Sequence, residues 1–318
     1  MTTAPSALIG GLLPAKGYKV GVNRELERLW NAVYRQQQRA ASAWARRRHR
    51  DEFDRVRAFC LFVGYPRSGH SIVGAILNAH RNAVISHELD APQLILAGCS
   101  RDELYSRILA RAQWFAMRGN PADHPLEVPN QWQGRFEELH VIGDKRGGAA
   151  ARCIAEHPDF LDRLRSLVGI PIRLVHVVRN PFDNIAAISK LRGLSLADSA
   201  DYYFLHCRTT SRLGTLCAPG ELITVRHEEM LREPVAALTE LCDFLGLERY
   251  PGYIEDATAV LYRAPSRTGR DAAWPQGLIE EIGRRARAHR FLDGYAVESP
   301  VERTRIVGPN PGGRQPHA

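Results

Sequence analysis

Residues 62–71 read FVGYPRSGHS, an apolar strand that breaks into a glycine-bounded turn, and the apolar run 72–77 that follows is typical of a helix. The free backbone N–H groups of such a loop and the positive end of the following helix converge on one anion. The stretch therefore predicts a phosphate-binding loop at the end of the first strand.

The glycine spacing of this loop fits the nucleotide P-loop at all but one position, because His70 stands where that motif has lysine. Without the lysine, binding and transfer of an ATP γ-phosphate lose their usual cation, whereas Arg67, inside the loop, supplies a different one. A kinase with a degraded P-loop stays an alternative, and it would need magnesium held by an aspartate such as Asp144.

Composition indicates one large soluble domain, since the chain has 318 residues, of which 44% are hydrophobic and 25% charged. No apolar run is long enough to cross a bilayer, and no positive charge precedes the short apolar patch at 7–13. We therefore expect no membrane partner, no secretory signal and a cytoplasmic location. The six cysteines form no C-x-x-C pair and have no histidine at ligand spacing, so we expect no zinc or other metal site and no disulfide framework.

The net charge of +8 is compatible with an anionic ligand, an acidic partner or nucleic acid. The densest basic run, 46–50, is the best feature for a nucleic-acid or polyanion binder. Few aromatic residues interleave with the basic ones to stack on bases. We therefore interpret the run as a solvated helix end and expect no nucleic-acid partner.

Strand-like and helix-like runs alternate from residue 56 onward. The expected strands are 58–64, 83–86, 140–143, 172–178 and 221–225, and the expected helices are 71–79, 101–117, 149–156, 181–191, 195–213 and 234–245. This order predicts an α/β fold with a P-loop-NTPase-like parallel sheet that is flanked by helices on both faces and binds ligands at the carboxyl ends of its strands.

We divide the chain into an N-terminal arm (1–56), one catalytic domain (57–296) and a flexible C-terminal tail (297–318). The arm carries an amphipathic helix within 22–56, which either closes over the main domain or forms a homodimer contact. The Pro- and Gly-rich stretch 118–134 is typical of an excursion or lid.

A second anion-binding position is expected at Arg179, which emerges at the carboxyl end of a buried strand and begins a turn into a helix. Asn180 suits the cap of that helix and Pro181 its first turn. An arginine held there binds a phosphate through two parallel N–H bonds. Two such positions on one sheet imply a ligand with two separated phosphates.

At this point the residues resemble the sulfotransferases that use 3′-phosphoadenosine-5′-phosphosulfate (PAPS), most closely the branch with the bacterial and tyrosylprotein enzymes. The likeness covers residues 58–296 and rests on the loop 64–71, the segment 178–183, the strand end IGDK at 142–145 and the run VRHEEM at 225–230. The resemblance implies a sulfotransferase fold, PAPS as co-substrate, no required metal, and in-line transfer to a hydroxyl or amine of a small-molecule or glycan acceptor.

The resemblance also implies which residues bind PAPS. The 5′-phosphosulfate would lie on Arg67, Ser68, Gly69, His70 and Ser71, and the 3′-phosphate on Arg179 and Ser189. The family's hydroxyl falls at Ala187 in this chain, two positions before Ser189. The late phosphate segment of the family is only loosely matched by 263–267 and Arg270.

Three residues receive catalytic roles. Glu88 in the run SHEL matches the acidic position of the family and is the expected base, with His87 as its rival. Alternation along a strand predicts that only one of these two neighbours points into the site. Lys145 and Arg67 are expected to stabilise the charge that grows on the transferring group.

Overall fold

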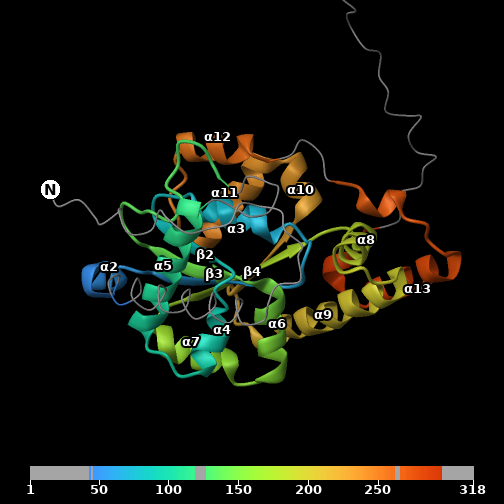
Figure 1. Ribbon diagram of the computed structural model, residues 1–318, viewed down its shortest axis with the longest axis horizontal. Coiled ribbons are helices and arrows are strands. Elements are labelled where there is room, and N and C mark those ends of the chain that lie inside the picture. Colours follow the sequence, from blue (N-terminus) through green and yellow to red (C-terminus); the bar gives the residue numbers. More distant parts are fainter. Residues whose placement is uncertain (1–42, 44–45, 119–126, 262–265, 296–318) are drawn as a thin grey trace, which may run out of the picture.

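The computed structural model describes residues 43, 46–118, 127–261 and 266–295. One sheet of parallel strands in the order β2-β3-β1-β4-β5 forms its centre (Figure 1). The strands are β1 (Ala58–Val63), β2 (Ala83–His87), β3 (Val141–Lys145), β4 (Ile172–Val178) and β5 (Leu222–Arg226). The predicted parallel α/β sheet is therefore confirmed.

Helices cover both faces of the sheet, on opposite sides of it in Figure 1. One face carries α3 (His70–Asn78), α10 (His227–Arg232), α11 (Pro234–Leu245) and α12 (Pro251–Ala259). The other carries α4 (Ala91–Leu96), α5 (Arg101–Arg118), α6 (Gly147–Glu156) and α7 (Phe160–Val168). A third group packs together beside the strand ends: α8 (Pro181–Arg192), α9 (Leu196–Leu216) and α13 (Gln276–Ala286). The short elements are α2 (Arg50–Phe53), η2 (Thr268–Asp271) and η3 (Arg290–Leu292).

The central strand β1 explains why this sheet is covered twice. Its six residues are all buried, and successive side chains alternate between the two hydrophobic clusters. Phe59 and Leu61 pack under α4 to α7, whereas Cys60 and Phe62 pack under α3, α11 and α12. The six cysteines of the chain are all free thiols, and Cys242 is buried in the same cluster as Cys60.

Several expected features lie outside the described residues: most of the N-terminal helix, the middle of the proposed lid at 119–126, and the C-terminal tail. The described end of the lid is packed onto the domain. Val128 is buried, the N–H of Trp132 donates to the carbonyl of Ala79, and the N–H of Gly134 donates to that of Asn78. No helix in the described part of the chain is long and apolar enough to cross a membrane.

Candidate active site

The loop after β1 has the backbone of an anion cradle. Gly64, Arg67 and Gly69 have positive φ values of 125°, 67° and 98°, and α3 begins at His70, directly after the loop. A Cβ added to Gly69 would lie 2.3 Å from Cδ2 of His227. Both the backbone conformation and the lack of space therefore require glycine at position 69.

Buried polar atoms without partners gather around this cradle. Among the described residues, Oγ of Ser68, Nδ1 of His70 and Nε of Arg179 are buried and have no hydrogen-bond partner. Buried donors and acceptors left unpaired cost free energy, so native proteins seldom retain them without a function. These three groups fit the binding of an oxyanion, whose oxygens would accept their hydrogen bonds.

Arg179 joins the second anchor to the cradle. It directly follows β4, is 6% exposed, and donates through Nη1 to the carbonyl of Arg67 at 3.2 Å. Its Nη2 donates to the carbonyl of Ser266 and to its hydroxyl at 2.9 Å, which places the described part of the late segment at the second anchor. The helix start is as predicted: Asn180 caps α8 by accepting from the N–H of Phe182 at 2.9 Å.

Ser189 is not brought to this anchor. It lies eight residues beyond Pro181 on α8, which is about 12 Å along the helix axis at 1.5 Å per residue. Its hydroxyl donates to the carbonyl of Leu194 at 2.6 Å, at the far end of the helix. Ala187, where the family has its hydroxyl, is buried.

Lys145, the last residue of β3, connects the cradle with the expected base. Its side chain is 1% exposed, and its Nζ donates to Oγ of Ser71 at 3.1 Å and to Oε1 of Glu88 at 3.0 Å. One ammonium group thus contacts the phosphate loop and the carboxylate at the same time. These contacts unite three of the residues that the sequence singled out.

The expectation that only one of His87 and Glu88 points into the site is wrong. Glu88 has left the strand, with φ at 57°, so the alternation of side chains does not extend to it. Nε2 of His87 lies 3.4 Å from Nζ of Lys145, and its ring stacks on Phe115 at a centroid distance of 4.3 Å. Both neighbours therefore reach the same ammonium group.

The environment sets different protonation states for these neighbours. Burial, helped by the charge of Lys145, lowers the pKa of His87 to about 4, so its imidazole is neutral at neutral pH. Burial would raise the pKa of Glu88, but the charge and hydrogen bond of Lys145 outweigh it and hold that pKa below its usual value. Burial lowers the pKa of Lys145 itself, although Glu88 opposes the shift. Glu88 is therefore an ionised carboxylate that can accept a proton.

Asp144 holds the loop that carries Glu88. Its buried carboxylate accepts from the hydroxyl of Ser86 at 2.8 Å and from the N–H groups of Leu89 and Ala91 at 3.0 and 2.9 Å. These bonds occupy both carboxylate oxygens, so Asp144 is not the free metal ligand that a kinase would need. Within the described ranges, no group of three His, Cys, Asp or Glu residues is placed to hold a metal ion.

His227 is a site residue that sequence reasoning missed. It begins α10 directly after β5, and its ring packs against Gly69 of the cradle. Its Nδ1 is buried without a hydrogen-bond partner among the described residues. Its position at the carboxyl end of a parallel strand was the available signal, because that edge of the sheet also holds the cradle.

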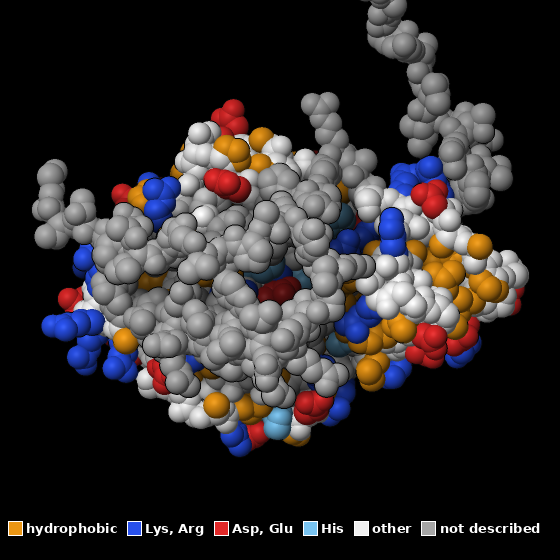
Figure 2. Space-filling view, viewed as in Figure 1, with side chains coloured by type: hydrophobic (Ala, Val, Ile, Leu, Met, Phe, Trp, Pro, Cys, Tyr) orange, Lys and Arg blue, Asp and Glu red, His pale blue; other side chains and the backbone are white. Residues whose placement is uncertain are grey.

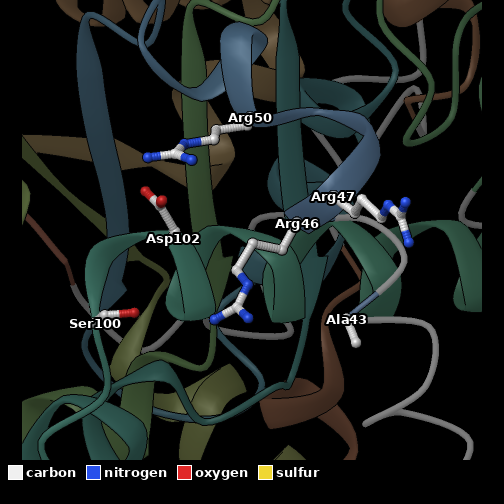
Figure 3. Close-up of a pocket in the computed structure, with 6 residues that line it drawn as sticks. All are labelled: Ala43, Arg46, Arg47, Arg50, Ser100 and Asp102. Carbon is white, nitrogen blue, oxygen red and sulfur yellow. The ribbon is translucent and has the colours of Figure 1, made fainter.

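Two views place the charges of the molecule. At the centre of Figure 2, acidic and histidine side chains are visible, and Lys and Arg side chains gather beside them toward α8 and α9. A separate cavity of about 580 Å³ is lined by Ala43, Arg46, Arg47, Arg50, Ser100 and Asp102 (Figure 3). The cavity lies beside α2, which precedes the start of β1. Its arginines are therefore at the amino ends of the strands, whereas the cradle is at their carboxyl ends.

Comparison with solved structures finds sulfotransferases at low identity. The sulfotransferase domain of the Synechococcus PCC 7002 olefin synthase is 17% identical, with a TM-score of 0.46 over 73% of this chain and 94% of that chain. Sulfotransferase STF9 from Mycobacterium avium is 10% identical, with a TM-score of 0.45 over 81% and 82% of the two chains. Mouse sulfotransferase SULT7A1, complexed with PAP, is 13% identical, with a TM-score of 0.41 over 76% and 89%.

No curated protein matches the chain. The model of the sulfotransferase family, by contrast, matches residues 61–251, which include the end of β1, the cradle, Glu88, Lys145 and Arg179. This match covers more than half of the sequence and confirms the resemblance that the two loops indicated. The chain therefore belongs to the sulfotransferase family.

Proposed function

We propose that this protein transfers a sulfuryl group from PAPS to a hydroxyl or amine of a small-molecule or glycan acceptor and releases 3′,5′-adenosine bisphosphate. One observation carries the proposal: Nζ of Lys145 bonds both Ser71 of the cradle and Glu88, at 3.1 and 3.0 Å. A group transferred from the cradle would thus meet an ionised base next to a buried cation. This is the arrangement that in-line transfer to a nucleophile requires.

The donor-binding residues follow from the two anchors. The cradle from Arg67 to Ser71 would hold the 5′-phosphosulfate, and Arg179 the 3′-phosphate. The unpaired atoms of Ser68, His70 and Arg179 support this fit, because phosphate oxygens would accept their hydrogen bonds. His227 is expected to contact the donor beside Gly69.

In the proposed mechanism the donor supplies an activated sulfur–oxygen bond. Glu88 accepts the proton of the acceptor as its oxygen or nitrogen forms a bond to sulfur. The bond between sulfur and the bridging phosphate oxygen breaks, and Lys145 and Arg67 stabilise the charge left on that oxygen. Lys145 also holds Glu88 in its ionised state before transfer.

The contacts of the described site residues do not favour the kinase alternative. Asp144, its expected magnesium ligand, uses both carboxylate oxygens to fix the turn after β2. The cradle has His70 at the lysine position of a kinase P-loop, and the burial of this ring lowers its pKa to about 3, so it supplies no positive charge.

The test is a thermal-shift titration with 3′,5′-adenosine bisphosphate beside one with ATP and magnesium. Ligand at a hundred times its dissociation constant should add about 2.7 kcal/mol to the free energy of unfolding. We expect stabilisation by the bisphosphate and none by ATP with magnesium. Stabilisation by ATP with magnesium alone would refute the proposal.

A further inference from the structure

The first turn of α6 has free backbone donors next to the proposed base. The helix begins at Gly147, and the N–H groups of residues 147–149 donate to no described residue. The cap residue Arg146 does not bond the turn, because its guanidinium pairs with Asp90 at 2.7 Å. The turn thus combines three N–H groups that have no acceptor among the described residues with the positive end of a ten-residue helix.

Two buried imidazoles point at this turn. His206 of α9 is 6% exposed, and its ring has no hydrogen-bond partner among the described residues. Its Cε1 lies 3.8 Å from the position that a Cβ on Gly148 would take. His70 is 8% exposed, and its unpartnered Nδ1 lies 3.2 Å from the corresponding position on Gly147. Neither ring has a hydrogen-bond partner among the described residues. Since His70 is already assigned to the cradle, His206 is the imidazole left for this turn.

Positive charge surrounds the same turn. Arg152 lies four residues after Gly148, on the same face of α6, is exposed, and has no ion pair within the described ranges. Arg192 of α8 donates to the hydroxyl of Tyr202 at 3.0 Å, and the Tyr202 ring contacts His206 at a centroid distance of 4.7 Å. The charges of Arg152 and Arg192 both act on the imidazole of His206, so they lie near it.

We propose that the first turn of α6, His206, Arg152 and Arg192 form an anion subsite that binds a carboxylate, phosphate or sulfate group of the acceptor. The inference rests on the proposed function, since it names the acceptor class of that site. PAPS already has its two anchors, in the cradle and at Arg179. This third group of N–H and cationic groups is therefore left for the acceptor.

The position of the subsite suits an acceptor of modest size. Gly147 follows Lys145 by two residues, so their Cα atoms lie at most about 7 Å apart. The Cβ position on Gly148 is also 3.8 Å from Cδ of Pro66 in the cradle. An acceptor whose nucleophile meets Glu88 could therefore place an anionic group on α6 within the length of one small molecule.

The test is an NMR titration of the protein, saturated with 3′,5′-adenosine bisphosphate, with inorganic phosphate. The bisphosphate fills both donor anchors, and the backbone amide signals of Gly147, Gly148 and Ala149 report on the turn. We expect these signals to shift with phosphate and the dissociation constant to rise roughly tenfold in Arg152→Ala, as loss of one charge-assisted bond implies. Arg152→Lys should retain most of the affinity. His206→Phe, which keeps an aromatic ring but removes the ring nitrogens, should weaken phosphate binding.

Arg208→Ala is the matched control, because it removes an exposed arginine from the same helix as His206 on a side near His289. Equal phosphate affinity in the Arg152 and Arg208 variants, or shifts confined to residues outside the turn, would overturn the subsite. Failure of the bisphosphate to bind would refute the proposed function instead. In that case the same amide signals are followed in Arg67→Ala protein without bisphosphate. Signals of residues 147–149 that move on addition of phosphate would still support the subsite, and signals that do not move would refute it.

Discussion

Lys145 and Glu88 hold each other through two separate hydrogen bonds. The ammonium of Lys145 donates to Oε1 of Glu88 at 3.0 Å, and the backbone N–H of Glu88 donates to the carbonyl of Lys145 at 3.2 Å. The second bond continues the β2–β3 ladder one residue past the end of β2, although φ of Glu88 is positive. The carboxylate is thus positioned by the backbone as well as by charge.

Replacement of Glu88 tests its role as the base. Glu88→Gln should lower the turnover number about a hundredfold or more, because the amide cannot accept the proton of the acceptor. Binding of 3′,5′-adenosine bisphosphate should stay within about twofold of the wild type, since Glu88 contacts no residue of the cradle directly. Steady-state kinetics and calorimetry measure the two quantities. Unchanged turnover in Glu88→Gln, with a large loss in His87→Asn, would assign the role to His87.

Replacement of Arg179 tests the second anchor. Arg179→Ala should weaken binding of 3′,5′-adenosine bisphosphate by tenfold or more, since a charge-assisted phosphate contact is lost. Ser189→Ala should leave the affinity unchanged, because its hydroxyl bonds Leu194 at the far end of α8. Calorimetric titration of both variants provides the measurement. A loss of affinity in Ser189→Ala would restore that residue as a phosphate ligand.

Replacement of Lys145 should change the pH dependence of the reaction. Lys145 holds the pKa of Glu88 below its usual value, so the base stays ionised as the pH falls and activity is lost only when it is protonated. In Lys145→Ala that pKa rises, and the acid limb of kcat/KM should move to higher pH while the maximum falls. Arg67→Ala is the control and should lower the rate without moving the acid limb. A Lys145→Ala profile with an unmoved acid limb would contradict the coupling.

Replacement of Gly69 should damage the cradle with little effect elsewhere. Alanine at a φ of 98° is strained by roughly 1–3 kcal/mol, and its Cβ would lie 2.3 Å from the His227 ring. Gly69→Ala should therefore lower the free energy of unfolding and abolish binding of the bisphosphate. Gly169→Ala is the control: its φ of 64° is also positive, but no atom lies within 4 Å of the added Cβ. Urea unfolding and thermal shift compare the two, and equal ligand binding in both variants would contradict the prediction.

His176 should make the protein less stable in mild acid. Burial lowers its pKa to about 3, whereas an unfolded histidine titrates near 6.5, so between these values the unfolded chain binds the extra proton. The contribution of neutral His176 to the free energy of unfolding is fully present above about pH 6.5. At pH 5 this contribution is smaller by about 2 kcal/mol. His176→Leu should reduce the difference between the free energies of unfolding at pH 7 and pH 5, as measured in urea. The exposed His157→Leu should not reduce it.

The sheet and both loops were predictable because their signals are local. All five strands and the starts of the helices after β1 and β4 follow from short apolar runs and from the turn residues between them. The short helices α4, α7, α10, α12 and α13 were not predicted. α4 and α10 have only six residues each and α12 has only two buried residues, so their apolar periodicity is weak. α7 and α13 do have buried apolar faces, and α13 packs beside the strand ends and not on the sheet.

The candidate site was predictable only where its residues lie at strand ends. Lys145 and Arg179 stand there, and the structure brings both to the cradle. The orientation of Glu88 was not predictable, because a positive φ at a residue other than glycine has no sequence signal. His227 had a signal, because it directly follows β5. His206 packs against the start of α6 from α9, and one sequence contains no information on which helix faces will meet.

The strand order has a consequence for synthesis of the protein. β1 pairs with β3 and β4, and β2 pairs with β3, so neither early strand has a partner in the sheet until residue 145 has been made. An apolar strand without its neighbours is prone to aggregate while the chain grows. The yield of folded protein will therefore depend on growth temperature and chaperone supply during translation, and an N-terminal fragment that ends before β3 will not fold by itself.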